Sequence, residues 1–115
     1  MNTKNTSCKF ENDAKRLSAL AHPVRLKIVR HLVHENACCV KNLVERVDLA
    51  QSTVSQHLKT LLNAGLVTYQ TRQQSSWYEI NREEFAKLSD SLNVMFDECC
   101  NCEIMPSSDK NVTKK

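Results

Sequence analysis

Three cysteines crowd the C-terminal part of the chain in the run Cys99-Cys100-Asn101-Cys102. Thiolates are soft ligands that favour thiophilic ions. Three-coordinate As(III) or Sb(III) needs no more than three thiolates, whereas zinc prefers four ligands in a closed tetrahedron. We therefore predict that Cys99, Cys100 and Cys102 bind As(III) or Sb(III), with Cd, Pb and Zn as further candidates. Cys99 and Cys102 share a helical face, and Cys100 joins them if the last turn unwinds.

The spacing Cys99-x-x-Cys102 is also typical of a redox pair, so redox or reactive-sulfur sensing is an alternative. A reactive thiolate is favoured by positive surroundings or by a helix N-terminus. This run instead follows a predicted helix and stands among Asp97, Glu98 and Glu103. Because those acids would assist a bound cation, metal binding is the preferred interpretation. A third interpretation is a thiol-rich metal carrier that does not bind DNA.

Three other cysteines are weaker candidates for a sensing role. Cys38 and Cys39 precede a predicted helix. A core position and metal binding are equally compatible with that pattern, since free cysteine packs as a small hydrophobe. Cys8 stands in the polar N-terminal segment and is expected to be a bystander.

A second chemical signal lies in residues 51–63. Val54, Leu58 and Leu61 form an apolar stripe at helical spacing. The opposite face carries short hydrogen-bonding groups, one lysine and no acid. Such a face suits base edges and phosphate oxygens, which predicts contact with double-stranded DNA. The predicted contacts on this helix are Gln51, Ser52, Thr53, Ser55, Gln56, His57 and Lys59.

The elements that would position these residues follow from periodicity. Helical patterns and two β-rich segments predict, in order, helices at 10–21, 24–33, 40–47 and 51–63, strands at 66–71 and 76–80, and a last helix through 85–96. Gly65 is placed to end the fourth helix in the left-handed region. Asn81 and Glu84 form a capping-box pattern before the last helix. Arg72 in the hairpin is expected near phosphate or the minor groove.

This order predicts a mostly α (α+β) fold, a winged helix-turn-helix with the order α-α-α-α-β-β-α. One domain would span residues 10–103, between disordered segments at 1–9 and 104–115. The first and last helices each have an apolar stripe, and a core of this size cannot bury both. We therefore expect a homodimer, which would also double the length of DNA recognised.

The distribution of charge and the sequence composition indicate which classes of function are compatible with the chain. Residues 1–80 hold 11 Lys and Arg against 6 Asp and Glu, whereas residues 81–115 hold 5 against 7, so the first part is the one suited to a polyanion. The N-terminus has no apolar signal segment, and no apolar run approaches the roughly 18 residues of a membrane span. A cytoplasmic protein without a membrane partner, with its six cysteines reduced, is expected. No nucleophile–base pattern is visible, so an enzyme is not expected.

Residues 20–28 read LAHPVRLKI, and residues 51–58 read QSTVSQHL and are followed by AGLV at 64–67. The first segment is similar to the opening signature of the ArsR/SmtB family of bacterial metal-responsive repressors, and the second resembles the recognition helix of that family. With the strand containing Trp77-Tyr78, the match covers about residues 14–82. The resemblance implies a homodimeric winged helix-turn-helix that binds a palindromic operator and leaves it when an inducer binds.

The chain departs from the family pattern at three places. Ala50 stands where the family usually has a serine N-cap, so the cap falls to Asp48, to Ser52 or to no side chain. The predicted hairpin lacks its usual glycine, which leaves its turn type open. Arsenic repressors often carry Cys-x-Cys before the third helix; here Cys39 matches the first thiol and Lys41 takes the place of the second.

Overall fold

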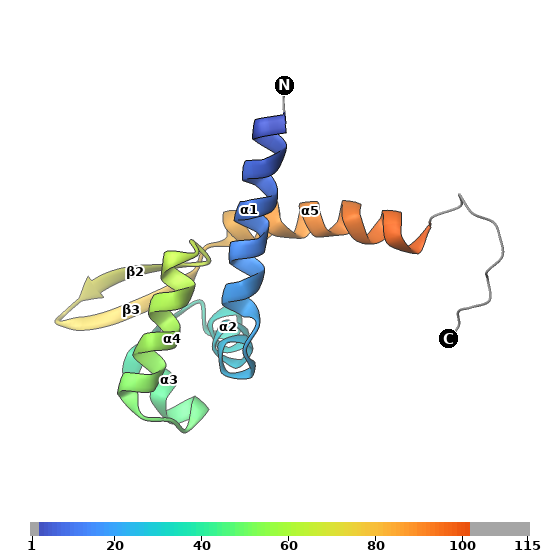
Figure 1. Ribbon diagram of the computed structural model, residues 1–115. Helices are drawn as coiled ribbons and strands as arrows, with labels where there is room; N and C mark the ends of the chain where they lie inside the picture. Colours follow the sequence, from blue (N-terminus) through green and yellow to red (C-terminus); the bar gives the residue numbers. More distant parts are fainter. Residues whose placement is uncertain (1–2, 102–115) are drawn as a thin grey trace.

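The computed structural model describes residues 3–101, and the side chains of residues 9–101. The elements run α1 (Thr3–Leu20), α2 (Pro23–Glu35), β1 (Ala37–Cys39), α3 (Val40–Val47), α4 (Gln51–Asn63), β2 (Val67–Arg72), β3 (Ser75–Ile80) and α5 (Arg82–Cys100) (Figure 1). All five predicted helices and the predicted hairpin are present. Helices α3 and α4 form the helix-turn-helix, and β2 and β3 form the wing beside it.

Strand β1 was not predicted, so the order of elements has one strand more than expected. It pairs antiparallel with β3, giving a three-stranded sheet in the order β1-β3-β2. With three residues, β1 is too short to show an alternating pattern. It becomes a strand because β3 offers it a free edge. Its register aligns Cys38 with Tyr78 and Cys39 with Trp77.

The first helix is longer than its apolar pattern indicated. Helix α1 begins at Thr3, within the segment predicted to be disordered. No glycine or proline precedes Phe10, so nothing in the backbone stops the helix from extending toward the N-terminus. The predicted C-terminal segment 104–115 lies outside the described residues.

The core sits where α2, α3 and α4 meet the sheet. Its fully buried side chains come from these elements and from the turn after α4: Ile28, Leu32, Cys38, Leu43, Val54, Leu58, Leu61 and Leu66. The apolar stripe predicted for α4 is therefore the face that packs inward. Its opposite face is left at the surface beside the wing.

The structure shows how α4 is capped at both ends. At the C-terminus, the N–H of Gly65 donates to the carbonyl of Leu62 at 2.9 Å, and that of Leu66 donates to Leu61 at 3.1 Å. Gly65 has a φ of 80°. The left-handed end that was predicted is therefore present, and its two hydrogen bonds make it a Schellman motif. At the N-terminus, Ala50 is the capping residue and no side chain caps the helix.

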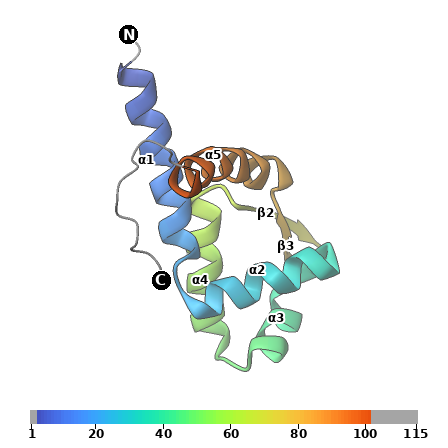
Figure 2. The ribbon, with the colours of Figure 1, turned by 90° about the vertical axis from the view of Figure 1, so that its right-hand side faces the viewer.

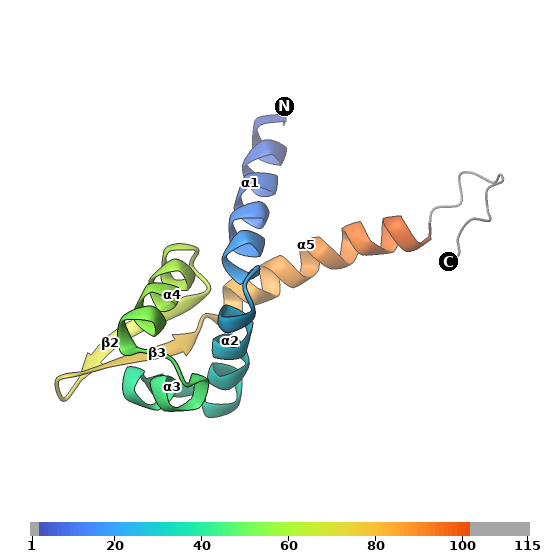
Figure 3. The ribbon, with the colours of Figure 1, turned by 60° about the horizontal axis from the view of Figure 1, so that its bottom comes forward.

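Helices α1 and α5 extend well beyond this core. The N-terminal half of α1 and the C-terminal half of α5 leave the body in different directions (Figure 2, Figure 3). The radius of gyration is 18.3 Å. A compact domain of this length would have about 13 Å. Large apolar side chains are exposed along both projections: Phe10, Leu17, Val94, Met95 and Phe96. No helix within residues 3–101 is long and apolar enough to cross a membrane.

Candidate nucleic-acid interface and cysteine sites

The outer face of α4 presents most of the predicted DNA contacts to solvent. Five of them are exposed: Gln51, Ser52, Thr53, Gln56 and Lys59. Ser55 and His57 are half-buried and lie on the two flanks of this face. Because no side chain caps α4, the first-turn amides also remain available to an outside acceptor.

His57 has a neighbour that the sequence did not reveal. Its ring centroid lies 4.5 Å from that of His22, with the rings tilted by 53°. His22 is the N-cap of α2, and its Nδ1 accepts a hydrogen bond from the amide of Val24 at 3.1 Å. Burial lowers the pKa of His57 from the ordinary value, and the nearby His22 and Arg25 lower it further. His22 stands in a turn far from His57 in sequence, so spacing carried no signal of this pair.

The wing is closed by an unusual turn. Gln73 and Gln74 both have positive φ, at 50° and 68°. Two successive residues with positive φ are the signature of a type I′ turn. The turn type left open by the missing glycine is thereby determined. Glutamine is sterically disfavoured in this region, which glycine and asparagine adopt more readily.

Arg72, the predicted wing contact, is exposed at the end of β2. Its guanidinium carbon lies 5.2 Å from the centroid of the Trp77 ring. This places a cation over an aromatic face. The contact holds Arg72 near the tip of the hairpin. Its role next to a DNA backbone stays a prediction.

Cys38 and Cys39 point to opposite faces of the sheet, because consecutive residues of a strand alternate. Cys38 is buried in the core, whereas Cys39 is half-buried on the other face, beside Trp77. Burial raises the pKa of the Cys38 thiol, and the neighbouring Cys39 and Glu35 raise it further. The two thiols therefore have different surroundings, one in the core and one on the other face of the sheet.

Cys99 and Cys100 are exposed in the last turn of α5. The helical hydrogen bonding continues to Asn101, whose amide donates to the carbonyl of Asp97 at 2.8 Å. Cys102, the third predicted ligand, lies outside the described residues. Within residues 9–101, whose side chains are described, no group of three or more His, Cys, Asp or Glu side chains is arranged to hold a metal ion.

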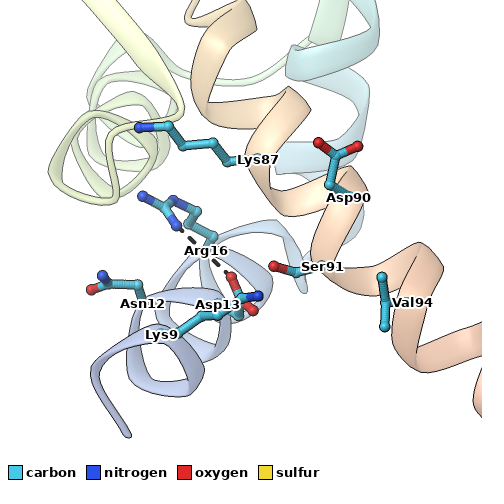
Figure 4. Close-up of a pocket in the computed structure, with 8 residues that line it drawn as sticks. All are labelled: Lys9, Asn12, Asp13, Arg16, Lys87, Asp90, Ser91 and Val94. Atoms are coloured by element: carbon cyan, nitrogen blue, oxygen red, sulfur yellow. Dashed lines mark ion pairs between the residues drawn. The ribbon is translucent and has the colours of Figure 1, made fainter. Parts of the chain in front are cut away.

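An ion-pair network joins the bases of α1 and α5. Arg16 of α1 pairs with Glu84 of α5 and, at 3.9 Å, with Asp13, while Lys87 pairs with Glu84 at 3.5 Å. The groove between the two helices is lined by Lys9, Asn12, Asp13, Arg16, Lys87, Asp90, Ser91 and Val94 (Figure 4).

The predicted capping box of α5 is formed only in part. Asn81 accepts a hydrogen bond from the amide of Glu84 at 3.3 Å. The reciprocal bond is absent because the amide of Asn81 donates to Leu66 at 2.9 Å, and the Glu84 carboxylate turns to Arg16 instead. The hydrogen bond of Asn81 thus connects α5 to the segment that follows α4. The ion pair of Glu84 connects α5 to α1.

Comparison with known proteins identifies this architecture. Residues 22–69 match the profile of the bacterial regulatory protein, arsR family. The arsenical resistance operon repressor of Bacillus subtilis (strain 168) is 37% identical over 92 residues, which is 75% of this chain and 88% of that relative. This chain belongs to the ArsR family. The resemblance seen in the sequence is thereby confirmed.

Solved structures agree with the ArsR assignment. The crystal structure of the transcriptional repressor PagR of Bacillus anthracis aligns with TM-score 0.61 at 36% identity, covering 65% of this chain and 85% of that one. The solution structure of a homodimeric winged helix-turn-helix DNA-binding domain from Mycobacterium bovis aligns with TM-score 0.68 at 22% identity, covering 93% and 97%. The predicted winged helix-turn-helix fold is confirmed, and the chain is a transcriptional regulator of this family rather than an enzyme.

Proposed function

We propose that this ArsR-family repressor binds a palindromic operator as a homodimer and leaves it when As(III) or Sb(III) binds Cys99, Cys100 and Cys102. The observation that carries the DNA-binding part is the exposed, acid-free face of α4 beside an exposed wing. A helix with its side chains is about 10–12 Å wide and fits the major groove of B-DNA, which is about 12 Å wide. In that position Gln51, Ser52, Thr53, Gln56 and Lys59 meet base edges or phosphates.

The inducer assignment rests on accessibility and on the relatives. Cys99 and Cys100 are exposed at the end of a helix, so soft ions can reach them. Arsenical resistance operon repressors occur among the relatives, including that of Staphylococcus xylosus at 30% identity over 95 residues, 81% of this chain and 90% of that relative. The alternative pair Cys38 and Cys39 is split across the two faces of the sheet. The cysteines at the end of α5 therefore fit a thiophilic ion better than Cys38 and Cys39 do.

Binding at this place would act on the shape of α5. Neighbouring residues of an α-helix project about 100° apart, so Cys99 and Cys100 cannot turn toward one ion while the last turn stays helical. Three thiolates on one ion require that turn to unwind. The same half of α5 carries exposed apolar residues that could pack against a second copy of the chain. Unwinding of the last turn would therefore alter the dimer that binds DNA.

The test is a titration of the reduced protein on a duplex that it has enriched from a random pool. We expect As(III) to lower affinity for this duplex about a hundredfold, which corresponds to a coupling of about 2.7 kcal/mol. Changing Cys99, Cys100 and Cys102 together to Ser should abolish the response, whereas Cys8→Ser should leave it intact. Parallel titrations with Cd, Pb and Zn rank the ions by the loss of duplex affinity that each one causes.

Other outcomes separate the alternatives. Release of the triple variant by As(III) would place sensing at Cys38 and Cys39. A wild type that ignores As(III) and responds to persulfide would be a redox or reactive-sulfur sensor that uses the same cysteines. Failure to enrich any duplex at physiological salt, together with tight metal binding, would support the thiol-rich carrier.

A further inference from the structure

A cluster of nitrogen-bearing side chains lies at the junction of α2 and α4. It consists of His57 in α4, His22 in the turn before α2, and Arg25 in the first turn of α2. The two imidazole rings are 4.5 Å apart at their centroids, and both His22 and Arg25 are close enough to His57 to repel its positive form. These are the charged and titratable groups that face His57 within the described residues.

The cluster offers hydrogen-bond donors, and no acid of the described residues is among its members. Nδ1 of His22 accepts from the amide of Val24, so its proton is carried on Nε2, which is left as a donor. The Nε of Arg25 is buried without a hydrogen-bond partner among the described residues. An imidazole donor, a titratable imidazole and a guanidinium that converge without an acid among the described residues are the chemistry of an anion site.

The position of the cluster identifies the anion as a DNA phosphate. His57 follows the exposed Gln56 directly and lies one turn after the exposed Thr53, so it flanks the face that would read bases. A helix about 10–12 Å wide nearly fills the major groove, and residues on its flanks therefore lie against the sugar–phosphate walls. His57 is on the flank that α2 covers, where His22 and Arg25 extend the contact.

We propose that His57, His22 and Arg25 form a phosphate-binding site for one strand of the operator, and that filling it adds a proton to His57. The inference rests on the proposed DNA binding and deepens it. A phosphodiester is a permanent anion at physiological pH, so it binds the protonated imidazole more strongly than the neutral one. DNA and the proton consequently favour each other's binding, as linked ligands must.

The direction of the pH dependence follows from this linkage. In the free protein the pKa of His57 is lowered, so His57 is neutral near pH 7. Phosphate raises the pKa in the complex. Operator affinity therefore rises as pH falls through the pKa of the complex, and it levels off below the pKa of the free protein. The rise is at most about tenfold per pH unit for each protomer, because one proton is bound per site.

The test measures affinity for the enriched duplex from about pH 8 to about pH 5.5, on either side of the ordinary histidine pKa, at constant ionic strength. The wild type should gain about tenfold or more toward acid, and His57→Gln should remove most of this gain. His34→Gln is the matched control, because His34 is exposed at the far end of α2.

His22→Ser keeps a capping oxygen for α2 while removing the ring, and should also flatten the profile. Arg25→Gln should weaken binding at every pH and lessen the salt dependence.

An NMR titration of the His57 ring with and without the duplex gives a readout that a structural role would not move. We expect the pKa of His57 to be higher in the complex. The same pKa in both states, or a pH profile of His57→Gln equal to that of His34→Gln, would overturn the inference while leaving DNA binding intact. Failure to enrich a duplex at any pH would instead contradict the proposed function itself.

Discussion

Gln56 and Lys59 lie close together on the exposed face of α4, yet they would recognise different parts of DNA. The amide of Gln56 has a donor and an acceptor, which match the edge of adenine in the major groove. The ammonium of Lys59 is a mobile point charge, which suits phosphate oxygens and carries no sequence information. Specificity and general affinity can therefore be separated by two single substitutions on one helix.

Gln56→Ala should cost about 1–3 kcal/mol on the enriched duplex and little on unrelated DNA. Lys59→Ala should weaken binding to both and reduce the salt slope by about one. Fluorescence anisotropy on the two duplexes at several salt concentrations measures both effects. An unchanged affinity of Gln56→Ala for the enriched duplex would show that the reading face is elsewhere on α4.

At the residue scale, the sequence predicted the exposed polar face of α4 well and the surroundings of its flanks poorly. Periodicity alone separates the inward Val54 and Leu58 from the outward Gln56. It cannot reveal that His57 stacks on His22, because that contact depends on how α2 packs against α4. Likewise, the sequence leaves Cys38 as a possible ligand, and only its place in β1 shows that its thiol faces the core.

At the scale of elements, the wing holds a strained connection. A two-residue type I′ turn favours Asn followed by Gly. Here both positions are glutamine. Each non-glycine residue at positive φ costs roughly 1 kcal/mol. The fold tolerates this cost because β2 and β3 are paired over their full length, from Val67 with Ile80 to Arg72 with Ser75.

Replacing Gln73 by Asn and Gln74 by Gly should therefore stabilise the protein by about 1 kcal/mol and raise Tm by about 4–8 °C. Thermal unfolding at a fixed protein concentration measures the change, since Tm depends on concentration in a dimer. Gln70→Gly, which places glycine inside β2 instead of in the turn, should lower Tm. A lower Tm for the turn variant would mean that the glutamine side chains contribute more than their backbone strain costs.

The helices and the hairpin were predictable because each has a strong local pattern. Strand β1 and the half-formed capping box of α5 were not. In both cases a partner far along the chain decides the local structure: β3 offers β1 an edge, and Leu66 accepts the amide of Asn81. At the N-cap of α4 the sequence left three options, and the structure has the one in which no side chain caps the helix.

At the scale of the whole molecule, α1 and α5 form two arms joined at their bases. The ion pair of Arg16 with Glu84 and the buried Leu88 fix α5 to the body near its start. Beyond that point the arms separate, and Phe10, Val94 and Phe96 are 62%, 61% and 55% exposed. A monomer has no further element within residues 3–101 with which to cover these surfaces. Burying a side chain of this size contributes about 1.5–3 kcal/mol, which favours a second copy of the chain as the cover.

We therefore expect the protein to sediment as a dimer at micromolar concentration. Leu92→Asp combined with Phe96→Asp would place carboxylates in the proposed interface, where an unpaired charge is costly to bury. The double variant should be monomeric, keep its helical circular dichroism and lose affinity for the enriched duplex, because one recognition helix contacts too few base pairs. Tyr69→Asp is the matched control: Tyr69 is also exposed but lies on the wing, so its variant should remain dimeric. A wild-type protein that sediments as a monomer, or a double variant that still dimerises, would rule out this surface as the interface.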